Sequence, residues 1–80
     1  MKTKNIIKYL HRAFDLDDSK AKEKALDKAL KKLRKREDKF KRRLDEAASK
    51  KDVEAIESKI KVIRQQRRKG LAALRALAAQ

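Results

Sequence analysis

Lysine and arginine dominate the chemistry available to this chain, and most of them lie in two stretches. Residues 28–43 hold ten basic side chains and residues 59–69 hold six, against only two acidic ones, so these stretches carry a formal charge of +14. The remaining residues hold ten basic and ten acidic side chains and are neutral overall. A charge density of this kind attracts polyanions, with nucleic acid as the first candidate.

The types of basic side chain indicate which part of a polyanion they would contact. Guanidinium groups bind phosphate in a bidentate manner, whereas lysines act as point charges. The basic stretches contain one aromatic residue, Phe40, which we expect to be used in helix packing, so stacking on unpaired bases is not favoured. Phosphate contacts position a protein without reading sequence. The candidate phosphate-binding residues are Arg34, Lys35, Arg36, Lys39, Arg42, Arg43, Arg64, Arg67, Arg68 and Lys69.

Catalytic and metal-binding chemistry has few residues to use. The chain has no cysteine and a single histidine, His11, so thiol nucleophiles and multi-histidine metal sites are excluded. The lone Gly70 cannot form a phosphate-cradling loop. His11 and Asp15 lie four residues apart, a spacing typical of an ordinary surface pair on a helix. We therefore predict that the protein is not an enzyme and uses no cofactor or metal.

The composition and the apolar pattern predict three helices that must position these cations. Proline is absent, and Lys, Arg, Glu, Ala and Leu are the abundant residues. We place the helices at residues 4–14, 18–47 and 50–78. In the second and third, apolar residues recur in alternating steps of three and four, which predicts a packing seam. The seam positions are Leu26, Leu30, Leu33, Glu37, Phe40, Leu44 and Ala47, followed by Val53, Ile56, Ile60, Ile63, Arg67, Gly70, Leu74 and Leu77.

A break in the phase of this seam predicts a tight turn at about residues 47–51. The first seam continued past Ala47 would require apolar residues at positions that hold Lys51 and Glu54. Residues 49–52 also resemble a capping box, in which Ser49 accepts from the backbone and Asp52 reaches back. A short turn makes the two long helices antiparallel neighbours, and their basic stretches then face each other.

The predicted fold is all-α, with a short N-terminal helix packed on a long antiparallel helical hairpin in one small domain, 1–80. We expect a near-neutral three-helix base and a projecting two-helix arm, which consists of the two basic stretches and the turn between them. The apolar residues expected in the base are Ile6, Ile7, Leu10, Phe14, Leu26, Leu30, Leu71, Leu74 and Leu77.

Two features of the seam leave alternatives. Glu37 and Arg67 either lie at the seam edge with their charged heads in water, which we favour, or Glu37 pairs with Arg67 or Arg64. Gly70 either ends the third helix or lies within a continuous helix that another helix approaches closely. We favour continuity because the seam keeps its phase through Leu74.

The predicted function is binding to the phosphates of duplex or structured DNA or RNA, with little sequence specificity. Each helix of the arm has about 20 residues and spans about 30 Å, close to one turn of a duplex. The alternative is a helical interaction module or adaptor that docks an acidic protein. Membrane-surface binding is disfavoured because the apolar stripe is needed inside the hairpin.

Assembly and location are the remaining predictions. A homo-oligomer, if one forms, should avoid the basic arm and use the base or the apolar residues Ile6, Leu10, Leu71 and Leu74. The chain lacks both an uninterrupted apolar span and a secretion signal, so we predict a soluble, cytoplasmic protein associated with the nucleoid or with RNA.

Overall fold

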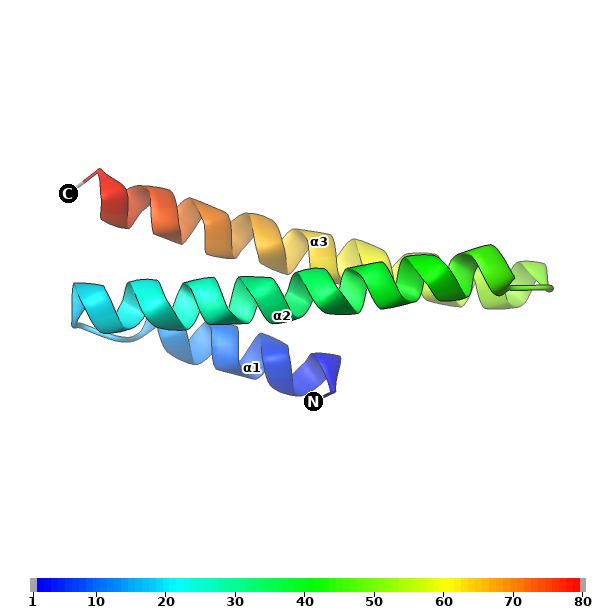
Figure 1. The fold of residues 1–80 in the computed structure, drawn as a ribbon, viewed down its shortest axis with the longest axis horizontal. Coiled ribbons are helices and arrows are strands. Elements are labelled where there is room, and N and C mark those ends of the chain that lie inside the picture. Colours follow the sequence, from blue (N-terminus) through cyan, green and yellow to red (C-terminus); the bar gives the residue numbers. More distant parts are fainter. Residues whose placement is uncertain (1, 80) are drawn as a thin grey trace.

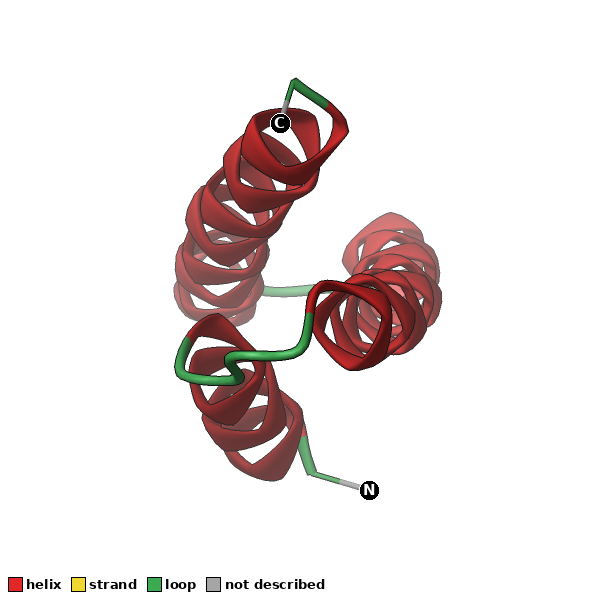
Figure 2. Cartoon of the chain, turned by 90° about the vertical axis from the view of Figure 1, so that its left-hand side faces the viewer, coloured by secondary structure: helices red, strands yellow, loops and turns green. Residues whose placement is uncertain are grey.

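The computed structural model describes residues 2–79 and has three α-helices. They are α1 (Thr3–Phe14), α2 (Ser19–Glu46) and α3 (Lys50–Ala78). The helices α2 and α3 form an antiparallel hairpin, and α1 runs back along the N-terminal half of α2 (Figure 1). Viewed end-on, the three helices lie at the corners of a triangle (Figure 2). The predicted all-α fold, a short helix on a long hairpin, is confirmed.

Side-chain caps define where the two long helices begin. Asp18 accepts hydrogen bonds from the backbone N–H groups of Lys20 and Ala21, at 2.9 and 3.1 Å, as expected for an N-cap. Ser49 Oγ accepts from the N–H of Asp52 at 3.1 Å and so caps α3. Within residues 2–79 the Asp52 side chain accepts no hydrogen bond from the backbone N–H of Ser49, so only half of the predicted capping box forms. The turn lies where the phase break predicts it, between Glu46 and Lys50.

The core runs along the inner line of the hairpin and beneath α1. Burial of a leucine, isoleucine or phenylalanine side chain contributes about 1.5–3 kcal/mol, so these contacts are the main source of stability. Most of the core residues occupy predicted seam positions. The buried core residues are Ile6, Leu10, Ala13, Leu26, Ala29, Leu33, Phe40, Ile60 and Ile63.

Gly70 lies inside α3 and does not interrupt it, which confirms the favoured alternative. The residue is buried, and a Cβ atom at this position would lie 2.7 Å from Leu30 Cδ2 and 3.2 Å from Leu10 Cδ1. The missing side chain therefore allows α3 to approach both other helices closely. Nearby, His11 Nε2 of α1 lies 2.8 Å from Gln66 Oε1 of α3, so His11 bonds to α3 and does not pair with Asp15.

The base is less closed than the sequence predicts, because α3 diverges from α2 towards its C-terminus (Figure 1). Leu71 is 41% exposed, so its expected place in the core is wrong, and Leu74 and Leu77 are only partly buried. The expected oligomer contacts also need correction. Ile6 and Leu10 are 2% and 0% exposed and cannot face a second copy.

Candidate functional site

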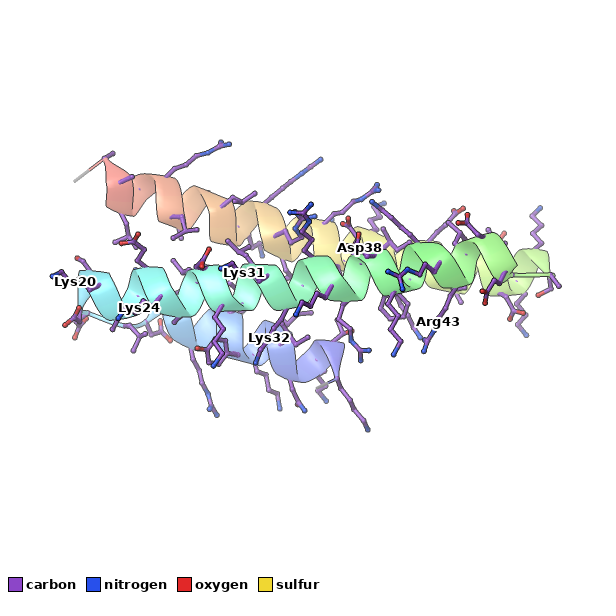
Figure 3. All side chains as sticks on the ribbon, in the orientation of Figure 1. Lys20, Lys24, Lys31, Lys32, Asp38 and Arg43 are labelled. Carbon is purple, nitrogen blue, oxygen red and sulfur yellow. The ribbon has the colours of Figure 1, made fainter. Side chains whose placement is uncertain are left out.

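One flank of α2 carries only cations over about three helical turns. Lys32, Arg36, Lys39 and Arg43 follow the spacing i, i+4, i+7, i+11, which places them in a single row on a helix. In Figure 3 the side chains of Lys32 and Arg43 extend from the side of α2 on which α1 lies, whereas Asp38 extends from the other side. Lys32 Nζ lies 5.6 Å from the ring centroid of Tyr9, which places the row beside α1.

Two adjoining grooves follow this row. The larger, which we call the Phe40 groove, has a volume of about 590 Å³. Its lining residues are Thr3, Arg36, Lys39, Phe40, Arg43, Ser58, Lys59 and Val62. The second groove is lined by Ile6, Lys32, Lys35, Arg36 and Lys39. Among residues 2–79, no carboxylate lines either groove. We call their combined cations the acid-free face, which consists of Lys32, Lys35, Arg36, Lys39, Arg43 and Lys59.

The ring of Phe40 gathers three cations from two helices. The Cζ atoms of Arg36 and Arg43 lie 5.9 and 5.5 Å from the ring centroid, and Lys59 Nζ of α3 lies 5.5 Å from it. Contacts of this kind contribute about 0.5–1 kcal/mol each at exposed sites. The three charges also repel one another, and no acidic side chain lines this groove to offset the repulsion. An anion bound among them would remove it.

The opposite flank of α2 has a different charge pattern. Arg34, Asp38, Lys41 and Asp45 follow the same i, i+4, i+7, i+11 spacing but alternate in sign. The groove on this side is lined by Lys41, Leu44, Glu57, Ile60, Lys61 and Arg64 and therefore includes a carboxylate. The arm thus has one purely cationic side and one side of mixed charge.

Glu37 lies between these flanks, on the seam, and is the buried acid of the hairpin. Its side chain is 5% exposed and contacts three cations, so the expectation that its head lies in water is wrong. Lys41 Nζ lies 3.2 Å from Oε2, and Arg67 Nη1 donates to the same oxygen at 3.3 Å. Arg64 Nε lies 3.4 Å from Oε1 but is not aligned for a hydrogen bond. The alternative of pairing with Arg67 or Arg64 is confirmed, with both of them.

These cations keep Glu37 ionised. Burial alone raises the pKa of Glu37, but the hydrogen bond and charge of Lys41 and the charges of Arg67 and Arg64 lower it by more, so the net shift is downward. The carboxylate is therefore negative at neutral pH. Its three ion-pair partners, Lys41, Arg64 and Arg67, all lie outside the acid-free face.

The ten predicted site residues fall into three groups. Lys35, Arg36, Lys39 and Arg43 come together on the acid-free face. Arg64 and Arg67 form ion pairs with Glu37. The others are exposed and line neither acid-free groove; they are Arg34, Arg42, Arg68 and Lys69.

Two members of the acid-free face, Lys32 and Lys59, are absent from the predicted site. Lys32 could have been found by separating the two flanks of the α2 seam, because it continues the row of Arg36, Lys39 and Arg43 by one turn. Lys59 flanks the seam of α3 next to Ile60. Pairing this flank with the right side of α2 requires the packed hairpin.

Other site types have little support among the described residues. In residues 2–79 no group of three or more His, Cys, Asp or Glu side chains is placed to hold a metal ion. None of the three helices there is both long and apolar enough to cross a membrane. Comparisons with protein-family models, curated proteins and solved structures give no match for the chain.

Proposed function

We propose that the protein binds the phosphates of duplex or structured nucleic acid, with little sequence specificity, through its acid-free face. The observation that carries this proposal is the lining of the two adjoining grooves, which holds six cations and no carboxylate. Such a surface attracts a polyanion and releases the counterions that surround it. A role near the nucleoid or RNA of the cytoplasm would follow.

The contrast between the two flanks of α2 supports a binding role over a purely solubilising one. A surface that only needs to be solvated can mix charges, as Arg34, Asp38, Lys41 and Asp45 do. Like-charge neighbours on a helix destabilise it by a few tenths of a kcal/mol each, on the order of one helix-pair interaction. The row that begins at Lys32 bears this cost along its whole length, which is explicable if an anion binds there.

The aromatic residues support phosphate contacts over base stacking. Phe40 is 5% exposed and its ring is surrounded by cations, so little of it is accessible to a base. Tyr9 is partly buried against the core. The molecule is 47 Å long and 22 Å wide, a size that covers slightly more than one turn of a duplex.

The test is a salt titration of binding to duplex DNA, duplex RNA and single strands of matched length. If about six cations contact phosphates, affinity for duplex should fall roughly 10³-fold between 50 and 200 mM salt. Single strands should bind more weakly because stacking contributes little. Absence of salt-dependent affinity for any nucleic acid would refute the proposal, and an acidic protein would then become the partner to test.

A further inference from the structure

The Phe40 groove differs from the second groove, which α1 lines through Ile6, because the N-terminal end of α1 reaches it. Thr3, the first residue of α1, lines the groove. The N-cap residue, Lys2, makes no side-chain capping hydrogen bond, and the first turn of α1 contains no acidic residue. A helix N-terminus carries a partial positive charge and unpaired N–H groups. The groove therefore has a cationic helix end in addition to its cationic side chains.

Two polar atoms of groove residues are buried without a partner. Thr3 Oγ1 and Arg36 Nε are both shielded from solvent, and neither has a hydrogen-bond partner within residues 2–79. Buried polar atoms in folded proteins nearly always have a partner, so each such exception requires an explanation. An anion in the groove provides one once a side-chain rotation brings Thr3 Oγ1 and Arg36 Nε to the groove surface, because both atoms are shielded in the conformation described here.

The cations around the groove come from both helices of the hairpin. Arg36, Lys39 and Arg43 belong to α2, and Lys59 belongs to α3. Arg43 and Lys59 each lie 5.5 Å from the Phe40 ring, which forms an apolar part of the wall between them. A group bound here would be held from two helices and from the end of a third, unlike an ion attracted to a single helical surface.

We infer that the Phe40 groove is a discrete binding site for one phosphate group of the bound strand. This inference rests on the proposed function. It adds that one phosphate bound in the groove fixes the position of the strand on the arm. The phosphate is either an internal diester with one negative charge or a terminal monoester with nearly two at neutral pH. Both present the same oxygen acceptors to Arg36, Arg43 and Lys59.

The experiment compares two double variants of the full chain. Each removes one arginine and one lysine, in one case from the Phe40 groove and in the other from outside it. Arg43→Gln with Lys59→Gln removes two cations from the groove. Arg42→Gln with Lys61→Gln removes one arginine and one lysine at neighbouring positions outside it. All four residues are exposed, so both variants should fold, which circular dichroism and thermal melting would verify.

A phosphate site in the Phe40 groove predicts that the two double variants lose unequal amounts of duplex affinity. The groove variant should bind duplex about tenfold more weakly or worse at low salt, with the salt slope reduced by about one, and the matched variant should lose less than about threefold. Duplexes with and without 5′-phosphates distinguish the source. A terminal monoester gives tighter binding to the phosphorylated duplex, and an internal diester gives equal binding. Equal losses of duplex affinity in the two double variants, with wild-type binding intact, would refute the phosphate site in the Phe40 groove without refuting the proposed function.

Inorganic pyrophosphate provides a probe that does not depend on nucleic acid. In the wild type, a pyrophosphate titration followed by NMR should shift the backbone amides of Thr3 and Lys4 and the Nε–H signal of Arg36. The groove variant should lose these shifts and the matched variant should keep them. Shifts of equal size on the Lys61 side would overturn the inference. Chemical-shift changes confined to the Phe40 groove, without any duplex binding, would support the phosphate site while refuting the proposed function.

Discussion

Glu37 of α2 and Arg67 of α3 are joined across the hairpin by a part-buried hydrogen bond, with Arg67 Nη1 3.3 Å from Glu37 Oε2. Glu37 is the only buried charged residue among residues 2–79, and its contacts with α3 tie the two long helices at one position. Buried ion pairs often add little net stability, and in some proteins they specify register. The pair therefore helps to determine which side chains of α3 face the groove side of α2.

Replacing Glu37 should destabilise the hairpin. Glu37→Gln keeps the shape but leaves Lys41, Arg64 and Arg67 without their counterion, and we expect a loss of about 1.5–3 kcal/mol in the free energy of unfolding. Urea denaturation followed by circular dichroism measures it. The control is Asp38→Asn, at an exposed neighbouring position, which should change stability by less than about 0.5 kcal/mol. Losses of the same size in both variants would contradict the structural role of Glu37.

The same carboxylate predicts a pH dependence. The pKa of Glu37 is lower in the folded protein than its ordinary value of 4.5, so the unfolded chain binds more protons as the pH falls between these two values. The stabilising contribution is complete above the ordinary pKa and is lost as the pH falls through the folded one. The difference in unfolding free energy between wild type and Glu37→Gln should therefore narrow as the pH is lowered from neutral through 4.5 and below. A constant difference over this range would count against a lowered pKa.

Gly70 should tolerate alanine but not a larger side chain. Alanine gains about 1 kcal/mol of helix propensity, while its Cβ forces Leu30 Cδ2 to move from a distance of 2.7 Å, so Gly70→Ala should be close to neutral. Gly70→Val should cost about 1–3 kcal/mol because it overpacks the contact with Leu10 and Leu30. Ala72→Gly, at an exposed position of α3, measures the propensity term alone. A stabilised Gly70→Val variant would refute the close approach of the helices.

The acid-free face should matter more for binding than an equal number of lysines elsewhere on α2. Lys32→Gln with Lys39→Gln should lower duplex affinity roughly 10–100-fold at low salt and reduce the salt slope by about two. Lys20→Gln with Lys24→Gln removes the same charge near the start of α2 (Figure 3). These two lysines line a separate groove that also holds Glu23 and Asp27. Their replacement should weaken binding less than about threefold. Comparable effects of the two pairs, measured by fluorescence anisotropy, would indicate a diffuse attraction instead of a binding face.

The hairpin could be predicted from the sequence because its evidence is local. The phase break after Ala47 and the cap at Ser49 are both encoded within a few residues, and they locate the turn. The burial of Glu37 could not be predicted in this way. Its seam position is visible in the sequence, but the stability of a buried carboxylate depends on Arg64 and Arg67, about 30 residues away, and on the exact packing of α3.

The candidate site was predictable in part for a related reason. Spacing along α2 places Arg36, Lys39 and Arg43 in one row, but it does not say which flank α1 covers. That choice brings Thr3 to the Phe40 groove and makes this side of the arm different from the other. The exposure of Leu71 depends likewise on the divergence of α3 from α2, and no local pattern encodes that angle.

Both long helices run from the base into the arm without interruption, and α3 does so even through Gly70. Within residues 2–79 both helices of the arm are therefore already formed, and neither needs to fold when a ligand arrives. Coupled folding produces a large negative change in heat capacity on binding, whereas association of rigid, charged surfaces does not. Association with a polyanion should therefore leave the heat capacity nearly unchanged, and its favourable free energy should come from the entropy of released ions.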